Sequence, residues 1–131
     1  RDFAHAPSKV IATIEAVKQQ FPSRKLIGVL ELHTYSSLNK EFMHQYKGAL
    51  EKTDTAVVFY SKHALQIKGL PELPESYVVE GFDKNGLLVM TDKNELEQWL
   101  RAQDYSNTNL VLMSSGNYDG IDLPSFAPTL I

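Results

Sequence analysis

The chain has 131 residues, of which 43% are hydrophobic and 22% are charged, a balance typical of a globular protein with a sizeable core. The net charge of −3 provides no positive field for nucleic acid or an anionic membrane surface, and the absence of cysteine excludes a disulfide scaffold and thiolate chemistry. No apolar run approaches the roughly 20 residues of a transmembrane helix, and no signal peptide is visible, so we expect a cytoplasmic protein.

The hydrophobic pattern predicts helices alternating with strands. A first helix from Pro7 to about Gln20 places four apolar side chains on one face: Val10, Ile11, Ile14 and Val17. Short apolar runs predict strands at Lys25–Leu32, Thr55–Tyr60, Leu87–Thr91 and Asn109–Ser114. Further helical segments are expected at about Leu38–Lys52, Ser61–Leu65, Glu75–Phe82 and about Lys93–Ala102, with a short final helix from about Leu123. Asp92 is the expected cap of the helix at 93–102.

This order indicates an α/β fold, specifically a Rossmann-like three-layer domain with a mostly parallel sheet and helices on both faces. We expect one domain over residues 1–131. In such sheets, ligands bind beyond the carboxyl ends of the strands. The loops His33–Ser37 and Ser115–Gly120 each follow a predicted strand, so we expect both at the same edge.

The first residues carry the most informative polar pattern. Asp2 and His5 directly precede Pro7, whose fixed φ and missing N–H suit the first turn of a helix. The N–H groups and positive dipole end of that helix form a site for phosphate, and an upstream carboxylate can hold a sugar hydroxyl. Nucleotide binding is one interpretation, and a helix cap or turn is the common alternative for such an aspartate.

The segment Asp-Phe-Ala-His-Ala-Pro-Ser (2–8) resembles the signature that opens the C-terminal domain of the Mur ligase family, a domain shared with folylpolyglutamate synthetases. Ala6 departs from this signature, which usually has a second His or an Asn there. In the family, a strand precedes the motif. We therefore expect the chain to be an excised C-terminal piece of a three-domain enzyme.

Residues 29–37, Val-Leu-Glu-Leu-His-Thr-Tyr-Ser-Ser, resemble a second signature of the family. In its alanine-adding ligase, two arginines of this signature hold the carboxylate of the incoming amino acid, a pairing that suits a guanidinium. Thr34 and Ser37 stand at those positions, which argues against alanine as the added group. Val29-Leu30-Glu31 instead resembles the murein peptide ligase subgroup, although Glu31 is equally compatible with a partly exposed structural carboxylate.

A third segment, 113–121, looks like the Ser-Ser-Gly-Asn-Phe-Gly-Gly-Ile loop of the same subgroup, with Asp119 in place of a glycine. By itself, the loop is ordinary turn chemistry. The resemblance implies nucleotide binding by Asp2 and His5. It implies peptide binding by a larger set of loop residues: His33, Thr34, Tyr35, Ser36, Ser115, Gly116 and Asn117.

The resemblance implies an ATP- and Mg²⁺-dependent amide-bond ligase of peptidoglycan synthesis or recycling. It would join L-alanyl-γ-D-glutamyl-meso-diaminopimelate to UDP-N-acetylmuramate through an acyl phosphate. The chain has no phosphate loop, and His44 and His63 lack metal-ligand spacing, so catalytic residues and metal ligands are expected in the N-terminal and central domains. The isolated domain is then inactive. The alternatives are an alanine or folylpolyglutamate-type ligase, or a stand-alone α/β binding module without catalysis.

Overall fold

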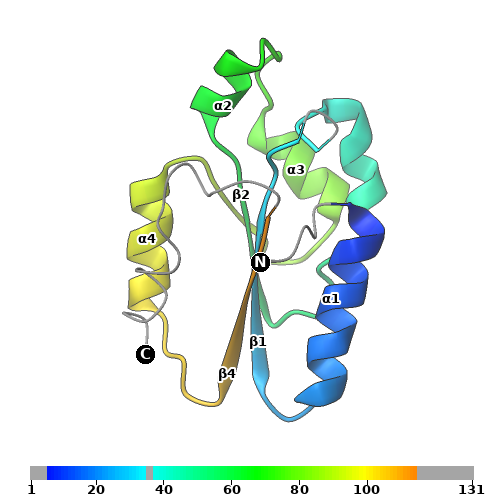
Figure 1. The fold of residues 1–131 in the computed structure, drawn as a ribbon, viewed down its shortest axis with the longest axis vertical. Coiled ribbons are helices and arrows are strands. Elements are labelled where there is room, and N and C mark those ends of the chain that lie inside the picture. The colour runs from blue at the N-terminus through cyan, green and yellow to red at the C-terminus, as the bar shows by residue number, and fades with distance from the viewer. Residues whose placement is uncertain (1–5, 35–36, 115–131) are drawn as a thin grey trace.

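The computed structural model describes residues 6–34 and 37–114 (Figure 1). Its elements in chain order are α1 (Pro7–Gln20), β1 (Lys25–Glu31), the 3-10 helix η1 (Lys40–Tyr46), β2 (Thr55–Phe59), α2 (Lys62–Ile67), α3 (Glu75–Phe82), β3 (Leu88–Met90), α4 (Lys93–Ala102) and β4 (Thr108–Met113). Several predictions fall outside the described residues: the final helix from about Leu123, and the site residues Asp2, His5, Tyr35, Ser36, Ser115, Gly116 and Asn117. No helix in the described part is long and apolar enough to cross a membrane.

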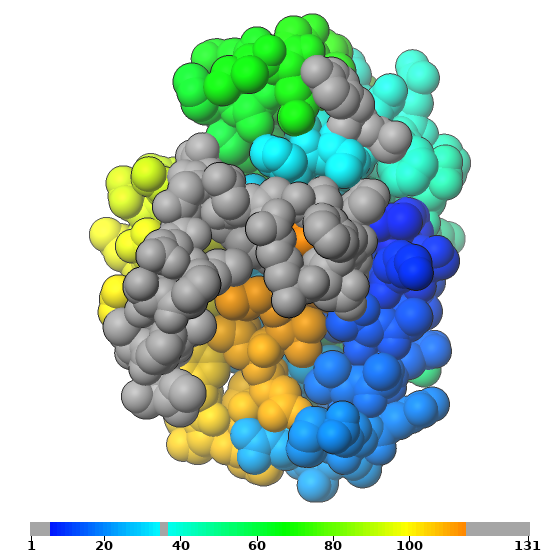
Figure 2. All heavy atoms as spheres, in the orientation of Figure 1, coloured from blue at the N-terminus to red at the C-terminus, as the bar shows by residue number. Residues whose placement is uncertain are grey.

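The four described strands form one parallel sheet in the order β3-β2-β1-β4. In Figure 1, α1 and α4 lie on opposite sides of this sheet, and α3 lies on the side of α1. The predicted three-layer α/β fold with a parallel sheet is therefore confirmed. Among the described strands, β4 lies at one edge of the sheet, and Figure 2 shows its surface between α1 and α4.

Each face of the sheet has its own hydrophobic core because side chains alternate along a strand. Leu26 and Leu30 of β1 pack toward α1 and α3, whereas Ile27 and Val29 pack toward α4. Six of the seven β1 residues are buried, with only Lys25 exposed, as expected of a strand covered on both sides. Trp99 of α4 is partly buried against the second core.

Three predicted helices have the predicted bounds: Pro7–Gln20, Glu75–Phe82 and Lys93–Ala102. Asp92 caps α4 by accepting a hydrogen bond from the N–H of Asn94 at 2.8 Å. Within α1, Val10 and Ile14 are buried, but Ile11 is 37% exposed. Its inward placement was therefore wrong, because a residue next to Val10 lies about 100° around the helix.

The predicted helix at Leu38–Lys52 is wrong. Only η1 is helical there, as a 3-10 helix, and turns follow it. Gly48 adopts a left-handed φ of +77°, which does not fit a continuous helix through this segment. A Cβ atom on Gly81 of α3 would lie 2.6 Å from the carbonyl oxygen of Met43, so glycine allows η1 to approach α3 closely. This contact is made by tertiary packing, which the periodicity of residues 38–52 does not report.

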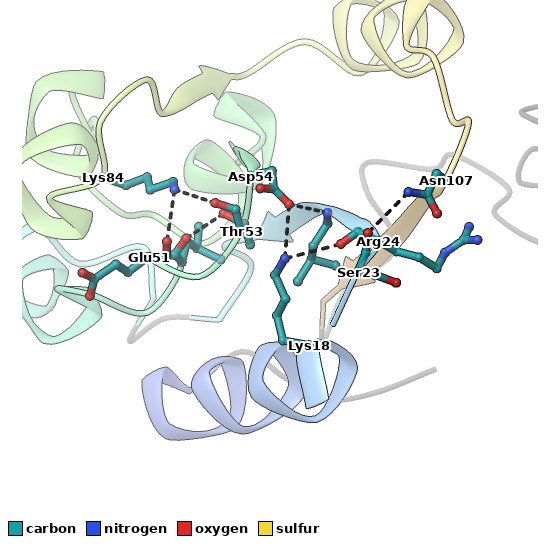
Figure 3. Close-up of polar contacts among 10 residues, drawn as sticks. Lys18, Ser23, Arg24, Glu51, Thr53, Asp54, Lys84 and Asn107 are labelled. Atoms are coloured by element: carbon teal, nitrogen blue, oxygen red, sulfur yellow. Dashed lines mark hydrogen bonds and ion pairs between the residues drawn. The ribbon is translucent and has the colours of Figure 1, made fainter. Parts of the chain in front are cut away.

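Polar side chains bind backbone groups at the amino ends of the strands (Figure 3). The Asp54 carboxylate accepts the N–H of Leu26 at 2.7 Å and lies 3.4 Å from the Lys18 ammonium. Arg24 donates to the carbonyl oxygen of Thr108 at 2.8 Å, and Lys84 donates to that of Thr53 at 2.6 Å. These contacts provide hydrogen-bond partners for backbone groups at or next to the first residues of the strands.

The hydrogen bond from the Leu26 N–H is the main cause of a pKa of Asp54 below its usual range, and Lys18 adds to it. A depressed folded-state pKa gives stability that is present above the unfolded pKa and is lost as the pH falls through the folded value. Asp54→Asn should therefore lower the free energy of unfolding at pH 7. The Asp54 side chain is 50% exposed, so screening limits this loss to about 1 kcal/mol.

Urea unfolding of wild type and variant at pH 7 and at about pH 3 measures this effect, and the difference between them should shrink at acid pH. Glu15→Gln is the matched control, because it removes the exposed 3.2 Å pair with Lys52 and should change stability by less than about 0.5 kcal/mol. A difference between wild type and Asp54→Asn that is independent of pH would contradict the role of the ionised carboxylate.

Candidate functional site

The carboxyl ends of β1 and β4 bring two polar side chains together. β1 ends at Glu31, β4 ends at Met113, and the parallel register pairs Leu30 with Met113. The next residues, Glu31 and Ser114, therefore lie side by side, and the Ser114 hydroxyl donates a hydrogen bond to Oε1 of Glu31. These residues are separated by 83 positions in the sequence.

The Glu31 side chain is fully buried, so its description as a partly exposed carboxylate was wrong. It lies on the same face of β1 as Ile27 and Val29, and it is paired in register with Phe59 of β2. Burying a carboxylate costs several kcal/mol unless hydrogen bonds or charges compensate it, and glutamate is almost never fully buried without a partner. An apolar side chain would fill such a position at lower cost, so this carboxylate points to a functional role.

His33 lies next to this carboxylate and is accessible from solvent. Its Nδ1 is 4.0 Å from Oε2 of Glu31, and the side chain is 34% exposed. The imidazole therefore lies between a buried acidic group and the surface at the carboxyl edge of the sheet. Sequence analysis selected His33 but attached no role to Glu31 or Ser114. The available signal was a charged and a polar residue at the ends of two apolar runs.

The loop after His33 is held by its own side chains. The N–H of Ser37 donates to Oγ1 of Thr34 at 3.1 Å, and the Thr34 hydroxyl donates to Oγ of Ser37 at 2.9 Å. The Ser37 hydroxyl donates to the carbonyl oxygen of Thr34 at 3.1 Å. Thr34 was predicted to bind peptide, but its single hydroxyl donor is directed within the loop, so only acceptor capacity is left for a ligand.

The start of α1 agrees with the prediction for Pro7. Ala6 is the N-cap residue with extended backbone, and its carbonyl oxygen accepts from the N–H groups of Lys9 and Val10 at 3.0 Å. Since α1 leads into β1 and runs opposite to it, its first turn lies toward the carboxyl edge of the sheet (Figure 1). The alanine side chain cannot cap the helix, so this N-terminus is compatible with a phosphate. The described residues therefore place the α1 start, His33, Thr34 and Ser114 toward one edge.

Tyr60 follows β2 at this edge and has a structural role. Its hydroxyl donates to the carbonyl oxygen of Leu73 at 2.5 Å, which fixes the loop at 70–74. Burial, with a smaller contribution from the charges of Glu75 and Glu72, raises the pKa of Tyr60 to about 12, so the phenol stays a neutral donor. Within residues 6–34 and 37–114, no three His, Cys, Asp or Glu residues form a group that could hold a metal ion.

Comparisons with known proteins give a local sequence match. No protein-family model matches the chain. UDP-N-acetylmuramate–L-alanine ligases from two strains of Lactobacillus delbrueckii subsp. bulgaricus are 46% identical to it over 55 residues, which is 42% of this chain and 12% of the ligases. The chain thus spans only a small part of the curated relatives it matches.

Solved structures match over nearly the whole chain. A murein peptide ligase from Psychrobacter arcticus has a TM-score of 0.71 at 16% identity, over 98% of this chain and 26% of that one. A domain assigned to a UDP-N-acetylmuramate:L-alanyl-γ-D-glutamyl-meso-diaminopimelate ligase from Haemophilus ducreyi has a TM-score of 0.66 at 24% identity, over 99% of this chain and 88% of that one. The UDP-N-acetylmuramate–alanine ligase of Thermotoga maritima has a TM-score of 0.60 at 18% identity, over 98% of this chain and 25% of that one. At these identities the structural matches establish the fold.

The hydrogen bonds between Thr34 and Ser37 can be tested without a ligand. Thr34→Val keeps the shape of the side chain but leaves the Ser37 N–H without its Oγ1 acceptor. An unsatisfied donor of this kind costs about 1.4 kcal/mol, so hydrogen exchange of the Ser37 amide should be about tenfold faster. Thr34→Ser keeps the acceptor and should preserve protection. Equal exchange in the two variants would show that Oγ1 does not hold the loop.

Proposed function

We propose that this chain, which resembles the Mur ligase family in both sequence and fold, is the C-terminal domain of an ATP-dependent amide-bond ligase of peptidoglycan synthesis or recycling. The full-length enzyme would activate the lactyl carboxylate of UDP-N-acetylmuramate as an acyl phosphate. The amine of L-alanyl-γ-D-glutamyl-meso-diaminopimelate would then attack that carbon and release phosphate. N-terminal and central domains would be the partners of this domain, and the isolated chain would be inactive.

The observation that carries this proposal is the meeting of two signature regions at the carboxyl edge of the sheet. Glu31, His33 and Thr34 belong to the region at 29–37, and Ser114 belongs to the region at 113–121. This edge is where open α/β sheets bind ligands. We assign peptide binding to the loops at 33–36 and 115–117, as the resemblance implies.

ATP is assigned to the segment that leads into α1. Asp2 would hold the ribose or the edge of the nucleotide, and His5 would contact the phosphate side. The α1 start is compatible with this role because neither Ala6 nor Pro7 has a side chain that can cap it. The described residues contain no cluster suited to Mg²⁺, so we assign that ion mainly to the other domains, where it would neutralise phosphate charge.

One observation favours a second candidate, a UDP-N-acetylmuramate–L-alanine ligase, because the curated relatives with 46% identity carry that name. The loop at 33–37 favours the peptide instead. Thr34 and Ser37 stand where the alanine-adding signature has arginines, and their hydroxyl groups are hydrogen-bonded to each other. Neither side chain can form a bidentate pair with a carboxylate.

Ligation assays on the full-length protein separate these candidates. With ATP, Mg²⁺ and UDP-N-acetylmuramate, we expect kcat/KM for the tripeptide to exceed that for L-alanine or L-glutamate by at least about tenfold, the value of one lost charge-assisted contact. A preference for alanine would assign the second candidate. Absence of ligation with every acceptor would favour a binding module without catalysis.

The nucleotide assignment predicts a specific effect of His5→Ala in the full-length protein. Loss of one hydrogen bond to a charged phosphate costs about 1.5–3 kcal/mol, so the Kd for ATP should rise about 10- to 100-fold. His63→Ala is the matched control, because His63 is exposed on α2 and should leave ATP binding unchanged. Unchanged affinity in His5→Ala, measured by calorimetry, would remove the phosphate role of this residue.

A further inference from the structure

We propose that Glu31 is a positioning residue that fixes the ring of His33 so that Nε2 accepts a hydrogen bond from the amine of the incoming substrate. The assignment of the amine rests on the function proposed above, whereas the Glu31–His33 arrangement rests on the structure alone. The juxtaposition that carries the proposal is a fully buried carboxylate, hydrogen-bonded by Ser114 on one side and facing Nδ1 of His33 on the other.

The Glu31 carboxylate is held from two strands. Its backbone is the last residue of β1, and its Oε1 accepts the hydroxyl of Ser114, the residue that follows β4. The parallel register brings these two positions side by side. The carboxylate is therefore supported by regular structure on both strands, the arrangement that holds a functional group most accurately.

The position of the carboxylate selects one form of the imidazole. Oε2 of Glu31 faces Nδ1 of His33 at 4.0 Å, and an ionised carboxylate only accepts hydrogen bonds. The favourable partner is a ring that carries its proton on Nδ1. In the neutral ring, Nε2 then has a lone pair and acts as an acceptor. Glu31 thus determines which nitrogen is available to a ligand.

The chain directly after His33 is itself held in place. Residues 34 and 37 are linked by three hydrogen bonds between their side chains and backbone, and the Leu38 N–H donates to the carbonyl oxygen of Thr34 at 3.1 Å. The His33 side chain remains 34% exposed. An accessible acceptor in a fixed position suits an amine, which must present an N–H and keep its lone pair for attack on the acyl carbon.

The first test measures the tautomer of His33 in the 131-residue chain by ¹⁵N NMR of the rings, at a pH where the spectra themselves show neutral imidazoles. We expect the Nδ1–H form to predominate in wild type. Glu31→Gln should lose this preference, while its amide oxygen still accepts from Ser114 and keeps the fold. The exposed His44 and His63 are internal references.

A predominant Nε2–H form of His33 in wild type would overturn the proposal, even if the variant failed to fold. An unchanged tautomer in a folded Glu31→Gln variant would overturn it as well. Glu31→Leu provides a further comparison, because it removes both the charge and the acceptor for Ser114. Loss of the Nδ1–H preference in both variants supports orientation by the carboxylate.

The second test uses the full-length enzyme. Glu31→Gln should raise KM for the amine substrate about tenfold and leave KM for ATP unchanged, because a displaced acceptor affects only the amine. Equal amine KM values in wild type and variant would overturn the proposal. Absence of ligation in wild type would refute the proposed function, and the tautomer measurement would still decide the role of Glu31.

Discussion

Parallel pairing of β1 with a strand on each side is the constraint on which the site depends. β2 and β4 flank β1, and all three strands end at the same edge. Hydrophobic side chains on both faces of β1 hold this register, since a shift by one residue would exchange its two cores. The register therefore also determines that Glu31 and Ser114 meet, although nothing in their local sequences requires it.

The two edges of the sheet use polar side chains differently. At the amino edge, Asp54, Arg24 and Lys84 bind backbone groups and so stabilise the ends of strands and loops. At the carboxyl edge, a buried carboxylate is paired with a hydroxyl and faces an imidazole. The contacts at the amino edge therefore mainly affect stability. By our proposal, the contacts of the buried carboxylate instead control the position of the imidazole, which a ligand can reach.

The similarity in fold extends much further along the chain than the similarity in sequence. The fold matches ligase structures over 98–99% of the chain, whereas the curated sequence match covers 42% of it. A buried parallel sheet tolerates many substitutions if apolar patterning is kept. A function depends on the side chains of a site, so a shared fold does not by itself assign one.

The sequence by itself determined the order of elements, the parallel α/β class and the bounds of three helices, because periodicity and capping are local properties. His33 was selected through the resemblance of residues 29–37 to a family signature. Only the tertiary structure showed that residues 38–52 do not form one helix and that Gly81 of α3 lets Met43 approach closely. Only the tertiary structure revealed the buried pair of Glu31 and Ser114, because a contact across 83 residues arises from strand register and two packed cores.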